Sequence, residues 1–308
     1  MAMRTCILCP GQGAQVVGMG KDFFEAHAVA RETFEAANRI VGFDLAAICF
    51  GGPEERLSQT DVSQPAIYVT SVAAYRAGVA AGFIGAETDA VYAGLSLGEY
   101  TALHLAGVFG FEDGLKLVAA RGRYMQDAAV ATPSGMVAVM GADEGAINEL
   151  CQQAAQGEVM VPANFNSPGQ IVVSGATGAC QRIAAAAETR GFRAIPLKVA
   201  GAFHSPLMRA AADKMKAELE KVAFSAPCCT VYSNVTAAPH TDAASIKRLL
   251  VDQIVRPVKW QQSMEAMIGM GNLRFVELAP GRTLAGLAKK INRRLPIESL
   301  GTAEAVGK

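Results

Sequence analysis

The sequence predicts an α/β fold in which a small unit is inserted into a larger one. The chain opens with a short apolar strand, a glycine-rich bend at residues 11–15 and a helical pattern, which is how an α/β unit begins. Between residues 135 and 199 the predicted order changes to βαββαβ, the signature of a ferredoxin-like unit. With 308 residues, 51% of them hydrophobic and 18% charged, the chain is able to bury a large core.

The larger unit is predicted to begin with residues 1–134. Hydrophobic periodicity and turn residues predict strands at 3–10 and 90–94 and helices at 21–39, 65–80 and 111–129, with a further helix directly after the second strand. Pro65 is expected in the first turn of its helix, where a proline costs no intrahelical hydrogen bond.

The inserted unit is expected to span residues 135–199. Its predicted strands are 136–140, 159–164, 170–174 and 193–199, and its helices are 143–155 and 177–190. Pro162 falls in the second strand, where it would interrupt the ladder of a central strand but is tolerated on an edge. The second strand of such a unit is usually an edge, so the proline agrees with the prediction.

The remaining chain, residues 200–308, is expected to return to the first sheet. Strands are predicted at 230–234 and 274–278, and helices at 206–222, 244–254, 258–270 and 282–291. Residues 303–308 are expected to form a loose tail. The larger subdomain would therefore consist of residues 1–134 and 200–308.

Composition excludes several classes of protein. Basic and acidic residues both number 28, so nothing suggests a nucleic-acid partner. No apolar stretch is long enough to span a membrane, and the run at residues 5–9 is too short for a secretory signal. Seven thinly spread cysteines do not indicate a disulfide framework, so we expect a cytoplasmic protein.

No metal site is expected. Cys6 and Cys9 have the spacing of a redox or zinc motif, but residues three apart on a strand point to opposite faces. The chain has no second CxxC that would complete a zinc site. Both thiols are therefore expected in the core.

Gly94-Leu95-Ser96-Leu97-Gly98 follows a predicted buried strand and precedes a helix. In this context a GxSxG sequence predicts a nucleophile elbow, with glycines that permit the sharp bend and a serine hydroxyl at its tip. The amide of Leu97 would then be able to point at a developing oxyanion. The alternative is a serine that only caps a helix in a tight turn.

A serine nucleophile needs a base, and the chain contains four histidines. His27 and His240 lie in polar surroundings and are expected in solvent. His104 lies eight helical residues from Ser96, roughly 12 Å along the axis, which is too far for proton transfer. His204 directly precedes a predicted helix start, Ser205-Pro206, which favours a neutral imidazole. It is the candidate base, and a loop histidine without a catalytic role is the alternative.

Arg121 lies on the same helix face as Val118 and Met125, whereas Arg123 points roughly the opposite way. An arginine on an apolar face is costly unless an anion pairs with it, and the planar guanidinium suits a carboxylate. That carboxylate belongs either to a substrate or to an internal Asp or Glu, and both interpretations stay open.

Several segments together carry a family resemblance: Pro10-Gly11-Gln12-Gly13-Ala14-Gln15, Gly94-Leu95-Ser96-Leu97-Gly98-Glu99-Tyr100, Arg121-Gly122-Arg123, Asn166-Ser167-Pro168-Gly169-Gln170, Gly201-Ala202-Phe203-His204-Ser205-Pro206, Asp252-Gln253 with Pro257-Val258-Lys259-Trp260, and Glu277-Leu278-Ala279-Pro280-Gly281. In this order they resemble the malonyl-CoA:acyl carrier protein transacylase family over nearly the whole chain. The resemblance implies an α/β-hydrolase-like larger subdomain interrupted by the ferredoxin-like one, with the site between them.

The resemblance also implies the chemistry: Ser96, helped by His204 as general base, takes a malonyl group from coenzyme A and passes it to the phosphopantetheine thiol of acyl carrier protein, for fatty acid or polyketide synthesis. The resemblance implies malonyl-CoA as a substrate and no bound cofactor, and we expect a monomer. The amides of Gln12 and Leu97 resemble the family's oxyanion hole, and Arg121 its clamp on the malonyl carboxylate.

Gln253 resembles the acceptor that orients His204, and Phe203 is similar to the residue found in malonyl-selective members. Two residues depart from the family pattern, because many members have histidine at the position of Leu95 and glycine at that of Ala279. Activity is expected to survive both changes because the elbow is complete.

Two other functions remain as alternatives. A lipase-like serine hydrolase or thioesterase uses the same elbow, but its triad order would need a histidine near the C-terminus, and none follows His240. A non-catalytic docking subunit would be expected to lack the nucleophile, the base or the arginine, and all three are present.

Overall fold

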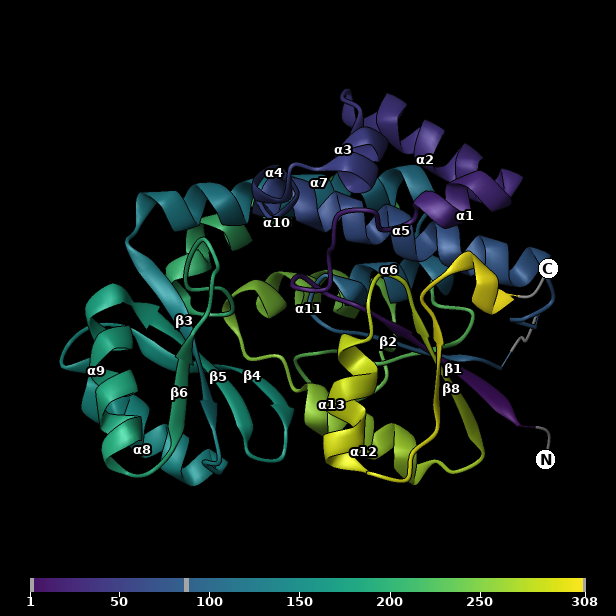
Figure 1. The fold of residues 1–308 in the computed structure, drawn as a ribbon. Coiled ribbons are helices and arrows are strands. Elements are labelled where there is room, and N and C mark those ends of the chain that lie inside the picture. Colours follow the sequence, from purple (N-terminus) through teal and green to yellow (C-terminus); the bar gives the residue numbers. More distant parts are fainter. Residues whose placement is uncertain (1–2, 86–88, 307–308) are drawn as a thin grey trace.

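The computed structural model describes residues 3–85 and 89–306, and it contains two separate sheets (Figure 1). The larger sheet is parallel and has the order β7-β2-β1-β8-β9; the smaller is antiparallel and has the order β4-β5-β3-β6. The larger sheet consists of β1 (Arg4–Cys9), β2 (Val91–Gly94), β7 (Thr230–Val231), β8 (Leu273–Leu278) and β9 (Ile297–Leu300). The predicted α/β class with an inserted unit is confirmed.

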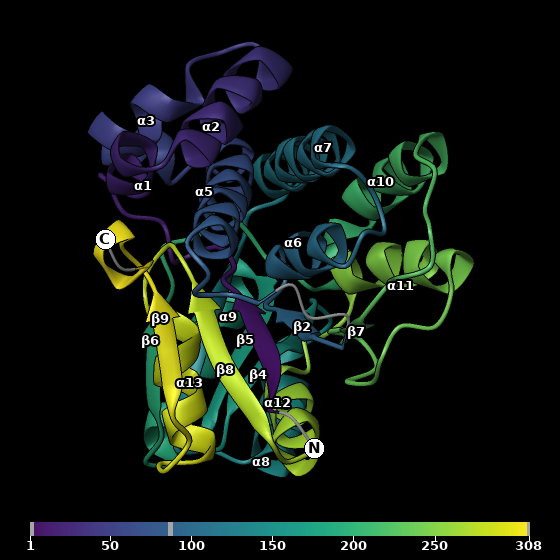
Figure 2. The ribbon, with the colours of Figure 1, turned by 90° about the vertical axis from the view of Figure 1, so that its right-hand side faces the viewer.

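Helices cover both faces of the larger sheet, as Figure 2 shows. Along β1 the side chains alternate: Ile7 and Cys9 join the core beneath one helical layer, and Cys6 and Leu8 join the core on the other face. Cys6 and Cys9 therefore lie on opposite sides of the sheet, as predicted. The helices are α1 (Lys21–Ala26), α2 (Ala28–Val41), α3 (Leu45–Gly51), α4 (Glu54–Leu57), α5 (Thr60–Ala80), α6 (Gly98–Leu105), α7 (Phe111–Ala131), α10 (Arg209–Lys221), α11 (Ala243–Val255), α12 (Trp260–Gly269) and α13 (Thr283–Ile291).

The smaller sheet has the strand order 2-3-1-4 when its strands are numbered along the chain, which is the ferredoxin-like arrangement. Its second strand lies at the edge of the sheet, the position that tolerates Pro162. On the outer side of this strand, Asn164 forms an isolated bridge with Val258 of the larger unit. Its elements are β3 (Ser134–Met140), α8 (Glu144–Ala155), β4 (Met160–Ser167), β5 (Gln170–Ala176), α9 (Thr177–Thr189) and β6 (Arg193–Pro196). The division at residues 134/135 and 199/200 stays a prediction.

Two predicted helices have different limits. The helix expected at 21–39 is broken at His27, whose backbone is extended, and the break lets Phe24 of α1 pack edge-on against Phe34 of α2. Pro65 lies inside α5 and not in its first turn, because the helix already begins at Thr60. Packing of α5 against α7 outweighs the single hydrogen bond that the proline removes.

The end of the chain is more ordered than predicted. Residues Ala303–Val306 form a short 3₁₀ helix, η2; Val306 is buried, and the amide of Ala303 donates to Asp22 of α1. Residues 307–308 lie outside the described residues.

The helix predicted at 206–222 begins with a 3₁₀ turn, η1 (Pro206–Met208), before α10. No helix of the described chain has the length and apolar character needed to cross a membrane.

Candidate active site

Ser96 lies at a sharp bend between β2 and α6. Its backbone has φ 53°, a left-handed conformation that non-glycine residues rarely adopt, and this turns its side chain out of the bend. A Cβ at Gly94 would lie 1.9 Å from the backbone of Gly98, and a Cβ at Gly98 would lie 2.1 Å from the carbonyl oxygen of Cys9. Only glycine fits at these two positions, so the nucleophile elbow has the geometry that the sequence predicted.

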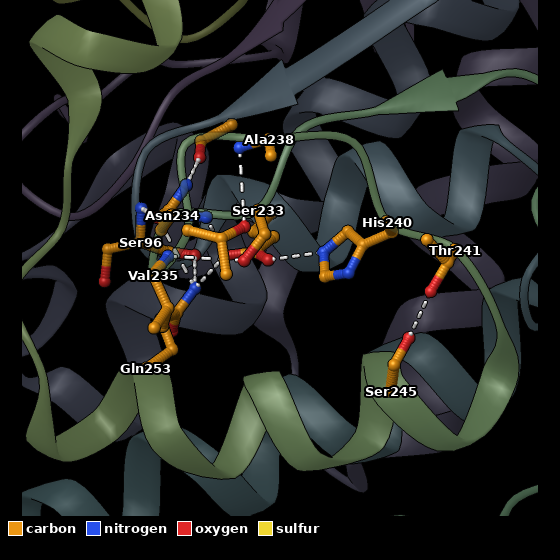
Figure 3. A network of polar contacts seen from close by, with 12 residues as sticks. Ser96, Ser233, Asn234, Val235, Ala238, His240, Thr241, Ser245 and Gln253 are labelled. Carbon is orange, nitrogen blue, oxygen red and sulfur yellow. Dashed lines mark hydrogen bonds and ion pairs between the residues drawn. The ribbon is translucent and has the colours of Figure 1, made fainter.

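The bend is fixed by hydrogen bonds from Asn234, which follows the neighbouring strand β7, and from Gln253 of helix α11. Asn234, just after β7, accepts a hydrogen bond from the Ser96 amide through Oδ1 at 2.6 Å and donates to the Gly94 carbonyl through Nδ2 at 2.7 Å. Gln253 of α11 donates to the Ser96 carbonyl at 2.9 Å (Figure 3). Because these bonds use the serine backbone, they leave its hydroxyl available.

His204 is within hydrogen-bond distance of the Ser96 hydroxyl. Its Nε2 lies 2.8 Å from Ser96 Oγ, and its Nδ1 lies 2.7 Å from the backbone carbonyl oxygen of Gln253. A carbonyl only accepts, so Nδ1 carries the proton and the Nε2 lone pair faces the hydroxyl. Burial, reinforced by the charge of Arg121, lowers the pKa of His204 to about 4, so the imidazole is neutral near pH 7.

Gln253 contacts His204 through its main chain, at the last turn of α11, where carbonyl groups lack intrahelical partners. Its side-chain amide is used elsewhere, because Nε2 donates to Ser96 and Glu99 while Oε1 accepts from Arg121. Gln253 therefore contacts His204, as expected, and the contact atom is its backbone oxygen.

The other three histidines form no hydrogen bond with Ser96 in the described chain. His104 Nδ1 is 3.0 Å from the Phe109 carbonyl oxygen, and His27 is half-buried at the break between α1 and α2. The expectation that His240 is solvated is wrong: its ring is fully buried, and Nε2 lies 2.7 Å from Glu99 Oε1. The loop after β7 folds back through a bond from the His240 amide to Val231, which brings the ring inside.

Arg121 is buried beside the serine, with 1% of its surface exposed. Its NH1 donates to Gln64 Oε1 at 2.7 Å, and its NH2 donates to Gln253 Oε1 at 2.9 Å and to Ser96 Oγ at 3.0 Å. Within the described chain it forms no ion pair with a carboxylate, and its Nε has no hydrogen-bond partner. Its hydrogen-bond partners are neutral, and Glu99 acts on it through its charge without a direct ion pair, so the guanidinium is suited to receive an anion from outside.

A cleft of about 350 Å³ opens above these groups, between the two sheets. The larger unit contributes the residues around Ser96, and the inserted unit contributes polar and apolar groups such as Asn166 and Met136. The residues predicted from the sequence that line it are Gln12, Ser96, Arg121, Phe203 and His204. Leu95, one of the two departures from the family pattern, lines it as well.

The two amides expected to form an oxyanion hole lie at neighbouring strand ends. Gln12 follows β1, and Leu97 is the N-cap of α6. A Cβ at Gly11 would lie 2.2 Å from the Leu95 carbonyl oxygen, so glycine lets the Gln12 loop approach the elbow. Among the residues the structure describes, neither amide donates a hydrogen bond.

The sequence analysis did not identify Gln64, Glu99 or Asn234 as site residues, and it did not predict that His240 is buried against Glu99. One signal was available for Asn234, because it ends a predicted strand and the carboxyl ends of parallel strands meet at one edge of a sheet. Gln64 lies next to the apolar residues that follow it in α5, from Pro65 to Val69, which is a second signal of a buried polar contact.

Comparison with known proteins identifies the family of the chain. The model of the acyl transferase domain family matches residues 7–307. The malonyl CoA-acyl carrier protein transacylase of Escherichia coli K12 is 41% identical over 298 residues, which cover 96% of each chain.

Two solved structures have the same fold. The malonyl CoA-acyl carrier protein transacylase of Coxiella burnetii superimposes with a TM-score of 0.94 at 38% identity, over 99% of this chain and 96% of the other. A malonyl-transacylase in complex with its type II PKS acyl-carrier protein gives a TM-score of 0.94 at 37% identity, over 98% and 97%. The chain therefore belongs to the malonyl CoA-acyl carrier protein transacylase family.

Proposed function

We propose that this chain transfers a malonyl group from malonyl-CoA to the phosphopantetheine thiol of acyl carrier protein through a malonyl-Ser96 intermediate. The observation that carries the proposal is Arg121, a buried guanidinium 3.0 Å from the nucleophile that has no carboxylate partner in the described chain. A malonyl thioester supplies that carboxylate, and an acetyl thioester does not.

In the first half-reaction the Ser96 hydroxyl attacks the thioester carbonyl carbon, and its proton passes to His204 Nε2. The amides of Gln12 and Leu97 stabilise the oxyanion of the tetrahedral intermediate. The carbon–sulfur bond then breaks, coenzyme A leaves as a thiol with the proton from Nε2, and malonyl-Ser96 remains. The Gln253 carbonyl holds the ring so that Nε2 faces the reacting oxygen throughout.

The second half-reaction reverses these roles. His204 takes the proton of the carrier's thiol, the sulfur attacks the ester carbon, and Ser96 leaves with the proton returned from Nε2. Because one site serves both half-reactions, ping-pong kinetics are expected. Coenzyme A and the carrier enter in turn, and the product supplies fatty acid or polyketide synthesis. Action as a cytoplasmic monomer is part of the same proposal.

Specificity is assigned to two residues that line the cleft. Arg121 pairs with the malonyl carboxylate, and Phe203, buried beside His204, limits the space for substituents on the acyl chain. The Leu95 and Ala279 departures leave the serine–histidine pair intact, because the contacts of Ser96 involve neither side chain. We therefore expect both departures to be compatible with activity.

Arg121→Ala should lower kcat/KM for malonyl-CoA by roughly tenfold to more than a hundredfold, because a charge-assisted bidentate contact in a closed cleft contributes about 1.5–3 kcal/mol. Acetyl transfer should fall far less, because acetyl has no carboxylate. Arg121→Lys keeps the charge but loses the planar fork, so its selectivity should be intermediate. Steady-state kinetics with both thioesters measure the ratio.

The matched control is Arg123→Ala, two residues along the same helix, where the side chain is exposed and contacts Tyr124. This variant should keep the malonyl-to-acetyl ratio of the wild type. If Arg121→Ala reduces both transfers equally, the arginine is structural and the malonyl assignment loses its support.

The carrier is expected to meet the cluster of Lys289, Lys290, Arg293 and Arg294 at the end of α13. All four are exposed, and the same helix lines the cleft through Thr283 and Leu287. Lys290 also donates to Gln170, a residue of the cleft wall, at 2.6 Å. These positions support the cluster as the surface that receives an acidic carrier.

Charge reversal at Lys289 and Lys290 should raise KM for the carrier about threefold to tenfold and leave KM for malonyl-CoA unchanged, because exposed pairs contribute up to about 1 kcal/mol each. The same reversal at Lys214 and Lys216 on α10, away from the cleft, is the control and should change neither constant. An equal effect on both substrates, or none, would remove the α13 cluster as the docking surface.

A further inference from the structure

Beneath the nucleophile lies a buried charged group that the transfer chemistry does not use. Glu99, in the first turn of α6, and His240, in the loop after β7, have fully buried side chains. Figure 3 shows that His240 belongs to the polar network that reaches Ser96, Asn234 and Gln253. Since burying polar groups costs free energy even when they are hydrogen-bonded to each other, stability alone does not explain this pair.

Three donors face the Glu99 carboxylate. Oε1 lies 2.7 Å from His240 Nε2; Oε2 accepts from Gln253 Nε2 at 2.6 Å and from the Asn234 amide at 3.2 Å. His240 must donate, because an ionised carboxylate only accepts. The imidazole therefore satisfies the one carboxylate oxygen that neither Gln253 nor Asn234 reaches.

The carboxylate determines how the Gln253 amide is oriented. Nε2 faces Glu99 Oε2, the Ser96 carbonyl oxygen at 2.9 Å and Asn234 Oδ1 at 3.5 Å, all of which are acceptors. Oε1 faces the Arg121 guanidinium at 2.9 Å. A flipped amide would place oxygen against three acceptors and N–H groups against a cation, and Glu99 Oε2, the closest of the three acceptors, opposes that state together with the Ser96 carbonyl and Arg121.

We propose that Glu99 and His240 are positioning residues: together they fix the amide orientation of Gln253, and through it they hold Arg121 in place for the malonyl carboxylate. This inference rests on the proposed function, because it takes Arg121 as the group that recognises malonyl. The coupling passes from His240 to Glu99, from Glu99 to Gln253, and from Gln253 to Arg121, each step through one hydrogen bond.

The test compares His240→Leu and His240→Gln in the full-length enzyme, with malonyl-CoA and acetyl-CoA as donors and the carrier as acceptor. His240→Leu leaves Glu99 Oε1 buried without its donor, so the malonyl-to-acetyl ratio of kcat/KM should fall about threefold to tenfold. His240→Gln keeps an N–H group that is able to reach Glu99 and should restore most of the ratio. A ratio unchanged by His240→Leu would overturn the proposal.

Measurements in the Arg121→Ala background separate this proposal from the proposed recognition of malonyl by Arg121. Arg121→Ala alone tests malonyl recognition, and an unchanged ratio there refutes that role whatever His240 does. In the Arg121→Ala background, His240→Leu should lower the ratio no further, because the pair acts through Arg121. An equal further fall in both backgrounds would show that His240 acts by another route and would contradict the proposal.

Thermal unfolding of each variant shows whether a change in rate reflects loss of folded protein. A merely structural role would lower malonyl and acetyl transfer together and leave their ratio unchanged. Should His240→Leu fail to fold, His240→Asn takes its place, because its shorter side chain carries the amide less far toward Glu99. The same fall in ratio is then expected, and its absence would contradict the proposal.

Discussion

Ser96→Ala should abolish formation of the acyl-enzyme and lower malonyl transfer by roughly 10⁶-fold, the scale seen when a serine nucleophile is removed. The hydroxyl is the atom that attacks the thioester, and no other side chain replaces it at 2.8 Å from His204 Nε2. The fold should persist, because the bonds that fix the bend run from the Ser96 amide to Asn234 and from Gln253 to the Ser96 carbonyl.

Intact-protein mass after incubation with malonyl-CoA and no carrier measures this effect. The wild type should gain one malonyl group, whereas Ser96→Ala should gain none. Ser174→Ala is the control, since this serine is also buried, lies on β5 and has no hydrogen-bond partner among the described residues. Labelling of Ser96→Ala at the wild-type rate would mean that another residue is the nucleophile.

Much of the fold could be predicted because its signals are local. The edge position of β4 followed from the predicted ferredoxin-like order and agreed with Pro162, and the elbow followed from a buried strand with glycines on either side of the serine. Strand β9 was not predicted. Four-residue β9 is too short to show a clear period, and it is held by its register with β8.

The site shows the same division between local and distant signals. Ser96 and His204 could be chosen from local sequence, the latter by elimination among four histidines. The buried state of His240 could not, because its polar neighbours Thr241 and Asp242 suggest solvent, while Glu99, its partner, lies 141 residues away. That Gln253 contacts His204 through a backbone oxygen also has no sequence signal, since every residue carries that group.

His204→Ala should lower kcat/KM by about 10²–10⁴-fold, the usual contribution of a general base, while malonyl-CoA binding changes little. Both half-reactions lose the group that moves the proton, so the loading and transfer steps should slow together. Single-turnover measurements with malonyl-CoA and then with the carrier check each step. A near-normal rate in either step would mean that His204 is not its base.

The pH dependence of the wild type gives an independent test of the same role. Burial, together with the charge of Arg121, lowers the pKa of His204 to about 4, and only the neutral imidazole accepts the serine proton. The wild-type kcat/KM should therefore fall as pH drops through about 4, and His204→Ala should lack this dependence. In Arg121→Ala the fall in kcat/KM should move to higher pH, because one cause of the lowered pKa of His204 is removed.

The stability of the fold depends on pH through the same group. The unfolded chain binds the His204 proton more tightly than the folded one, so stability is also lost as pH falls from about 6.5 toward 4. The folded fraction must therefore be measured at each pH, and a fall that follows unfolding alone would not support His204 as the base.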